Sequence, residues 1–323
     1  MKLPAPGSVT YRIRHTTRYR YASSVAIAHN EARLIPRDGP QQRAHSTRFV
    51  VEPSPSFMAR ELDYFGNAVN LFAFEEPHKT FSITAHSEVT VSSPVLPQPA
   101  STPPWEQSLA RGFDPAAPGM LDAMQYVYTS PHVEWNEQIR AYALESFPSG
   151  RPLLEGAFDL TRRIYKDFKY EPGVTSIATP VSTVFRARRG VCQDFAHLQL
   201  ACMRSLGLSA RYVSGYLLTR PPPGKEKLVG ADASHAWVSV FCPGYGFVDL
   251  DPTNDTVVGP DHTTLAWGRD FADVSPLRGV VLGGGSHTVH VAVDVTPVDP
   301  PAGAGGPSGK GPGPGPQQQQ QQQ

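Results

Sequence analysis

The chain has 323 residues, of which 40% are hydrophobic and 18% are charged, close to the balance of ordinary globular proteins. That length suits about two domains of roughly 150 residues each, and a sizeable core is possible. Lys plus Arg and Asp plus Glu number 29 each, which argues against the strong field that proteins use to bind nucleic acid or an anionic membrane.

The N-terminal segment has no apolar signal-peptide core after Lys2, and no stretch approaches the ~18 apolar residues of a membrane span. We therefore expect a cytoplasmic protein. The three cysteines, Cys192, Cys202 and Cys242, are an odd number in a long chain, which argues against a disulfide framework and leaves room for a reactive thiol. The simpler alternative is that they are small buried hydrophobic residues.

Residues 1–93 are expected to form a β-rich N-terminal domain. Aromatic and β-branched residues recur with period two in VTYRIRHTTRYRY, STRFVVEPS, AVNLFAFEE and FSITAHSEVTVSS. Residues 94–120 are crowded with proline, which fits neither a sheet ladder nor a helix interior. We interpret that stretch as a linker on the surface.

Residues 121–296 are expected to form a second domain of the α+β class. Helical spacing appears in HVEWNEQIRAYALESF and RPLLEGAFDLTRRIYKDF, and then in an apolar helix from about Cys192 to Leu206. Three strand-like runs follow, ARYVSGYLL, HAWVSVF and GFVDLD. Helices followed by antiparallel strands predict a buried helix packed on a sheet.

Three residues of this domain suggest nucleophilic catalysis. Cys192 follows a glycine-containing turn and starts the apolar helix, where the positive end of the helix dipole stabilises a thiolate. His235 heads one strand and Asp251 ends the next. A cysteine site needs a base to take the thiol proton and a carboxylate or amide to orient that base. Cys192, His235 and Asp251 supply these three roles.

The segments GVCQDFAHLQLACMRSLGLSARYVSGYL and DASHAWVSVFCPGYGFVDLDPTND resemble the catalytic core of the transglutaminase-like superfamily. YRIRHTTRYRY, NEARLIPRD, DYFGNAVNLFAF and EEPHKTFSITAHSEVTV resemble the β-rich domain that precedes this core in bacterial members. The resemblance implies a papain-like or transglutaminase-like core and a Cys–His–Asp triad. The triad maps onto Cys192 in GVCQDFA, His235 in HAWV and Asp251 in DPTN.

One departure from the family pattern is Phe247, where many members carry tryptophan in the final strand. The superfamily includes crosslinking acyltransferases, peptidases, amidases and members that only bind. We therefore expect acyl transfer or hydrolysis on amide carbonyls through a thioester on Cys192, with a protein or peptide as substrate. A non-catalytic binding module that keeps the fold is the alternative.

Other candidate residues favour structural roles. His197 lies five residues after Cys192 and so points elsewhere on a helix, and Asp194 sits in the first turn, where a carboxylate satisfies backbone N–H groups. Trp237 shares strand parity with His235 and could wall the site or fill the sheet core. Zinc bound by Cys192, His197, His235 and Asp251 lacks the usual close ligand pairs. No calcium-loop spacing appears, and no cofactor is expected.

The hairpin between the last two strands can be predicted in register. A three-residue loop at Cys242–Gly244, with glycine in the left-handed conformation, would pair Phe241 with Tyr245. That register sets His235 directly opposite Asp251, with Cβ atoms about 4.5–5.5 Å apart.

A two-residue turn at Gly244–Tyr245 is the competing hairpin. It would place Val238 opposite Asp251 and move the carboxylate roughly 10 Å from His235. The two registers make the hairpin a test of the choice of Asp251.

Residues 297–323 consist largely of glycine, proline and glutamine and offer no apolar surface to dock. We predict that removing Ala302–Gln323 leaves turnover and melting temperature unchanged. A large loss of either on truncation would contradict this interpretation.

Overall fold

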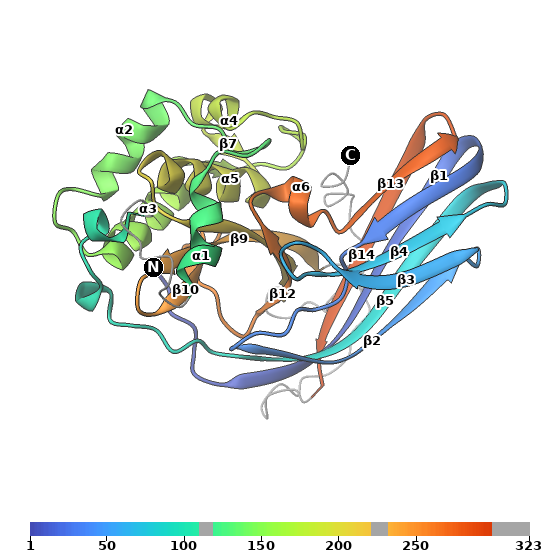
Figure 1. The fold of residues 1–323 in the computed structure, drawn as a ribbon, viewed down its shortest axis with the longest axis horizontal. Helices are drawn as coiled ribbons and strands as arrows, with labels where there is room; N and C mark the ends of the chain where they lie inside the picture. The colour runs from blue at the N-terminus through green and yellow to red at the C-terminus, as the bar shows by residue number, and fades with distance from the viewer. Residues whose placement is uncertain (110–118, 221–231, 299–323) are drawn as a thin grey trace, which may run out of the picture.

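The computed structural model describes residues 1–109, 119–220 and 232–298. Figure 1 shows a helix-covered unit built on a curled sheet beside a long two-layered β unit. The expected α+β fold with a β-rich N-terminal domain is confirmed. The tail expectation falls almost wholly outside the described residues, as does part of the expected linker.

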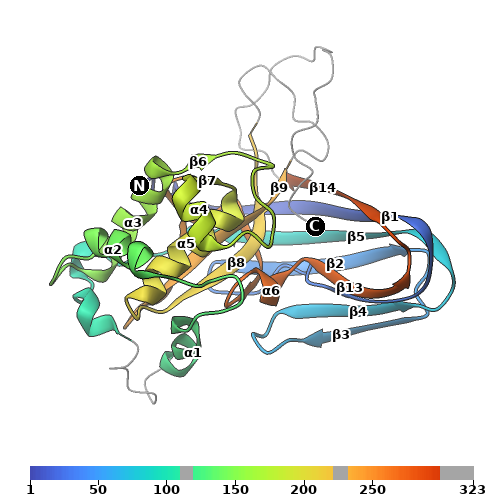
Figure 2. The ribbon, with the colours of Figure 1, turned by 90° about the horizontal axis from the view of Figure 1, so that it is seen from above.

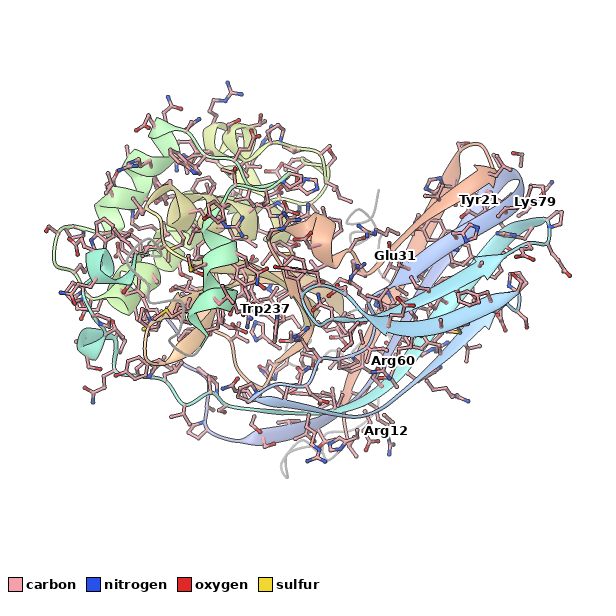
Figure 3. All side chains as sticks on the ribbon, viewed as in Figure 1. Arg12, Tyr21, Glu31, Arg60, Lys79 and Trp237 are labelled. Atoms are coloured by element: carbon pink, nitrogen blue, oxygen red, sulfur yellow. The ribbon has the colours of Figure 1, made fainter. Side chains whose placement is uncertain are left out.

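The β unit is organised by one long strand, β1 (Ser8–Ala32), that folds back on itself. Its first half pairs with β5 and β14 and its second half with β4 and β13, and the register shifts between Arg20 and Val25. Tyr21 and Lys79 mark the end where the strands turn (Figure 3). Two layers result, with Val25, Phe81 and their neighbours buried between them. The other strands are β2 (Gln42–Glu52), β3 (Phe57–Leu62), β4 (Ala68–Phe74), β5 (His78–Ser92), β13 (Leu277–Gly283) and β14 (His287–Pro297).

The last two strands belong to this β unit. β13 and β14 pair antiparallel with β1 over its two halves, and Figure 2 shows them running alongside β1. Residues 277–296 were expected in the catalytic domain, 121–296, whereas in the structure their strands complete the sheet of the β unit. The order of the sequence gives no indication of this pairing, because the strands that complete the first sheet follow the whole second unit along the chain.

The connection between the units carries short helical turns on the surface. These are η1 (Pro99–Ser101) and η2 (Trp105–Ser108) before the gap, then α1 (Met120–Met124) and η4 (Gln125–Val127). Three helices follow and cover one side of the second unit: α2 (Glu137–Ser146), α3 (Leu153–Asp167) and α4 (Val181–Ala187). A two-stranded parallel ladder of β6 (Lys169–Tyr170) and β7 (Arg189–Gly190) joins them.

The second unit is built around α5 (Cys192–Ser205), all of whose residues are buried. This helix packs on a five-stranded sheet in the order β11-β10-β9-β8-β12. The even-numbered residues of β9, including Ala236 and Val238, lie in the same core as α5. The strands are β8 (Ala210–Leu217), β9 (Ala233–Cys242), β10 (Gly246–Asp251), β11 (Thr256–Val257) and β12 (His262–Gly268), followed by α6 (Phe271–Val274).

Side-chain amides from the β unit cover the edge strand β12. Gln42 donates to the Thr264 carbonyl at 2.7 Å and accepts from its N–H at 2.7 Å. Asn67 bonds Trp267 in the same two-way manner, at 2.9 and 3.0 Å. These bonds replace those that a further strand would make and so block edge pairing.

No helix among the described residues is long and apolar enough to cross a membrane. The three cysteines are buried, and none of them forms a disulfide with another.

Candidate active site

The N-terminus of α5 carries Cys192, as the sequence predicted. Tyr170 in β6 pairs with Gly190 in β7, two residues before the cysteine, so the small ladder fixes the approach to the helix. The Asp194 side chain accepts from the Val191 N–H at 2.8 Å and from the Thr175 hydroxyl at 2.6 Å. Cys192 is 2% exposed, so its thiol lies in a nearly enclosed position at the helix start.

The hairpin that carries the other two residues has a different register from the one predicted. Cys242 pairs with Gly246 and Phe241 with Phe247, so the three loop residues are Pro243, Gly244 and Tyr245. The Tyr245 N–H donates to the Cys242 carbonyl at 3.0 Å. Proline followed by glycine at φ +82° is the pair that a type II turn takes at its central positions.

The predicted register is therefore wrong, and the competing two-residue turn is not formed either. Val238 faces Leu250, and the next step of the same ladder would bring Trp237 opposite Asp251. Relative to the expected pairing, the strands are offset by two residues, which leaves every side chain on its predicted face. The pairing was misplaced because the turn starts one residue later than the sequence suggested, at Pro243.

His235 and Asp251 still meet, on a diagonal across the two strands. The His235 Nε2–H donates to Asp251 Oδ2 at 2.8 Å. Diagonal neighbours on one face have backbones about 7–8 Å apart, a gap that an imidazole and a carboxylate can span. Because Nε2 is engaged, Nδ1 is the nitrogen left for Cys192, with which His235 also hydrogen-bonds.

Asp251 is fully buried and accepts four hydrogen bonds. Besides His235, its Oδ2 accepts from Asn254 Nδ2 at 2.6 Å and from His262 Nε2 at 3.1 Å, and its Oδ1 accepts from the Thr253 N–H at 2.8 Å. Charged carboxylates are buried in proteins only when paired and hydrogen-bonded in this way. His262 and Asn254 were not among the site residues predicted from the sequence.

The pKa values of the pair move in opposite directions. Burial alone lowers the pKa of His235, but electrostatic attraction to Asp251 and Cys192, with hydrogen bonds to both, raises it to about 10. Burial raises the pKa of Asp251, yet the charge and hydrogen bond of His235, together with His262, hold it well below its usual range. Both shifts favour the charged forms of the pair, an imidazolium beside a carboxylate.

Trp237 lies beside this pair, in the interior of the unit (Figure 3). It is fully buried, its ring lies 6.1 Å from that of His235 and 5.4 Å from that of His262, and its Nε1–H donates to Asp249 Oδ2 at 3.3 Å. The Trp237 ring both walls the His–Asp pair and fills the sheet core.

His197 lies elsewhere, as its position on the helix predicted. Its ring stacks on His132 at 5.6 Å, and its Nε2 accepts from the Phe271 N–H at 3.3 Å. The zinc set of Cys192, His197, His235 and Asp251 is therefore not assembled.

Ligand atoms of His235, Asp251 and His262 do lie within 4.8 Å of one another. Hydrogen bonds from both imidazoles to one carboxylate oxygen account for that arrangement.

Phe247 keeps an aromatic contact in the final strand. Its ring lies 5.2 Å from Phe241 and 5.9 Å from Tyr126, and the Arg211 guanidinium stacks 3.8 Å from its centre. The departure from tryptophan is accommodated by packing and by a cation–π contact, away from the His–Asp pair.

Comparison with known proteins matches both units. Residues 11–90 match the bacterial transglutaminase-like N-terminal region, and residues 140–252 match the transglutaminase-like superfamily. An uncharacterized protein of Mycobacterium tuberculosis is 42% identical over 307 residues, covering 93% of this chain and 96% of that protein. The chain belongs to the transglutaminase-like superfamily.

Two further relatives show how far the likeness extends. The protein-glutamine gamma-glutamyltransferase of Pseudomonas aeruginosa is 29% identical over 136 residues, 37% of this chain and 20% of that enzyme. A solved structure described as a candidate cysteine protease from Cytophaga hutchinsonii covers 91% of this chain and 92% of that one, with a TM-score of 0.70 and 19% identity. The structural match shows that the two chains share a fold.

We predict that Cys192 is the first cysteine of this transglutaminase-like core to react with iodoacetamide. Burial raises the pKa of Cys202 and of Cys242 to about 12, whereas Cys192 has an imidazolium beside it. Mass-spectrometric mapping of native protein after brief alkylation measures the order. Faster labelling of Cys202 or Cys242 would contradict the assignment.

We also predict a pH window in which the His–Asp pair contributes to stability. A histidine whose folded pKa is raised to about 10 stabilises the fold fully below its unfolded value and loses that contribution as pH rises toward 10. Urea unfolding of wild type and Asp251→Asn at several pH values measures it. The stability difference should shrink steadily between about pH 6.5 and 10, and a constant difference would exclude the coupling.

Proposed function

We propose that Cys192, His235 and Asp251 form a catalytic triad that performs acyl transfer or hydrolysis on amide carbonyls of a protein or peptide. The observation that carries the proposal is the 2.8 Å bond from His235 Nε2 to Asp251, which leaves Nδ1 to the cysteine. This is the nucleophile, base and orienter relation of cysteine acyl enzymes.

The reaction has two halves. The Cys192 thiolate attacks the carbonyl carbon at the start of α5, where the helix dipole favours the developing oxyanion. His235 gives its Nδ1 proton to the leaving amine or ammonia, and a thioester remains. His235 then takes a proton from the acceptor, which attacks the thioester and frees the sulfur. Asp251 keeps the imidazole oriented in both halves.

The acceptor decides the product. A primary amine such as a lysine side chain gives a new amide, and water gives hydrolysis. The matching glutamyltransferase of Pseudomonas aeruginosa and the neighbour described as a candidate protease point to these two outcomes respectively. The expected cytoplasmic location stays a prediction.

The proposal predicts a covalent acyl-enzyme on Cys192. Full-length protein would be incubated with a glutamine-containing peptide, with and without a biotinylated primary amine. Ammonia release with amine incorporation indicates transfer, release without incorporation indicates deamidation, and peptide fragments indicate proteolysis. Cys192→Ala should lower each rate by at least about 10³-fold, while Cys242→Ala serves as the matched thiol control.

A non-catalytic binding module is the alternative. It predicts that Cys192→Ala behaves as wild type in every assay and that no thioester forms with any acyl donor. Asp251→Asn should also leave such a module unaffected, whereas in an enzyme it costs about 10²–10⁴-fold in turnover through loss of the oriented imidazole.

A further inference from the structure

The buried site holds a second histidine, His262, which contributes no atom to the proposed triad. We propose that His262 is a positioning residue that fixes the Asp251 carboxylate toward His235, an inference that rests on the proposed triad. It comes from β12, a different strand from those that carry His235 and Asp251, and it is 5% exposed.

The bonding pattern around Asp251 shows what His262 does. Three N–H groups converge on Oδ2, from His235 at 2.8 Å, Asn254 at 2.6 Å and His262 at 3.1 Å. Asn254 also lies 3.4 Å from His235 Nε2, on the same side as the working bond. His262 approaches from another strand, so it opposes rotation of the carboxylate away from His235.

The hydrogen on His262 can be assigned. An ionised carboxylate only accepts hydrogen bonds, so Nε2 must carry the hydrogen. The Nδ1 atom is buried with no hydrogen-bond partner among the residues that the structure describes. At a buried position without a partner, an unpaired nitrogen lone pair costs less free energy than an unpaired N–H group. The Nε2–H tautomer, which leaves Nδ1 without a hydrogen, is therefore favoured.

A glycine makes room for the ring that packs against His262. β8 and β9 separate β12 from β10, so the contact between His262 and Asp251 depends on the curl of the sheet. Gly215 on β8 pairs with His235 on one side and Thr264 on the other, and the Trp237 ring, 5.4 Å from that of His262, lies over it. A Cβ there would clash with the Trp237 ring and the Thr263 carbonyl oxygen.

The position of His262 is set from outside the catalytic unit. Two residues further along β12, the Thr264 backbone is held by the Gln42 amide of the β unit, and Asn67 holds Trp267. The β unit thus fixes the strand that carries His262.

The test uses alkylation of Cys192 by iodoacetate, whose rate needs no known substrate. An anionic reagent reacts fastest while the thiolate faces an imidazolium, so the alkaline limb of the pH profile reports His235. Full-length wild type, His262→Leu, His262→Gln, Asp251→Asn and the double variant Asp251→Asn/His262→Leu would be compared. His290→Leu, at an exposed position on β14, controls for loss of a histidine, and circular dichroism checks folding.

In the wild type we expect the alkylation rate to fall on the alkaline side near pH 10. In His262→Leu the midpoint of that fall should lie about one pH unit lower. Glutamine places an amide N–H near the original Nε2, so His262→Gln should recover most of the shift. The double variant should match Asp251→Asn alone, because His262 acts through that carboxylate. A histidine with a merely structural role would change folding or melting temperature and leave the limb in place.

Three outcomes would overturn the inference: an unmoved or raised limb in folded His262→Leu, additive shifts in the double variant, or a wild-type profile changed by EDTA, which would assign the cluster to a metal. Failure of the triad has a different signature. In that case His235→Ala would leave the alkylation profile of Cys192 unchanged.

Discussion

The second unit depends on one buried carboxylate. Asp251 has no exposed surface and carries its charge in the interior, an arrangement that costs several kcal/mol unless every lone pair is satisfied. Its donors come from the start of β9, from the turn after β10 and from the start of β12. Asp251 thus joins these three segments through hydrogen bonds. The same Oδ2 atom orients the His235 imidazole, which also bonds Cys192.

The β unit contributes to this arrangement through strand β12. Gln42 and Asn67 imitate a neighbouring strand along its open edge, and His15 bonds the Tyr216 hydroxyl at 2.8 Å within the contact between the units. The buried His15 has its pKa lowered by desolvation to about 4, so this bond stays neutral across the physiological range. The role of the first domain therefore includes mechanical support of the second.

The sequence predicted the helix start at Cys192, the strand positions of His235 and Asp251 and their shared face, because turn residues and period-two patterns are local signals. It could not predict the register, since a turn that begins at Pro243 instead of Cys242 changes every pair. His262 carried no signal either. It meets Asp251 across two intervening strands because the sheet curls, and such curvature cannot be read from local sequence. The pairing of β13 and β14 with β1 could not be predicted for a related reason, because pairing between strands far apart in the sequence leaves no local signal.

The return of β13 and β14 to β1 has a bearing on biosynthesis. As the chain leaves the ribosome, β1 appears first, but the strands that cover its remaining edge appear only after the whole catalytic unit has been made. Until then β1 presents unpaired backbone groups, the kind of edge that recruits foreign strands. Final closure of the sheet joins the most distant parts of the chain and is intrinsically slow. The nascent protein is thus most prone to aggregation late in translation, when the edge of β1 is still unpaired and a chaperone that covers it would have the largest effect.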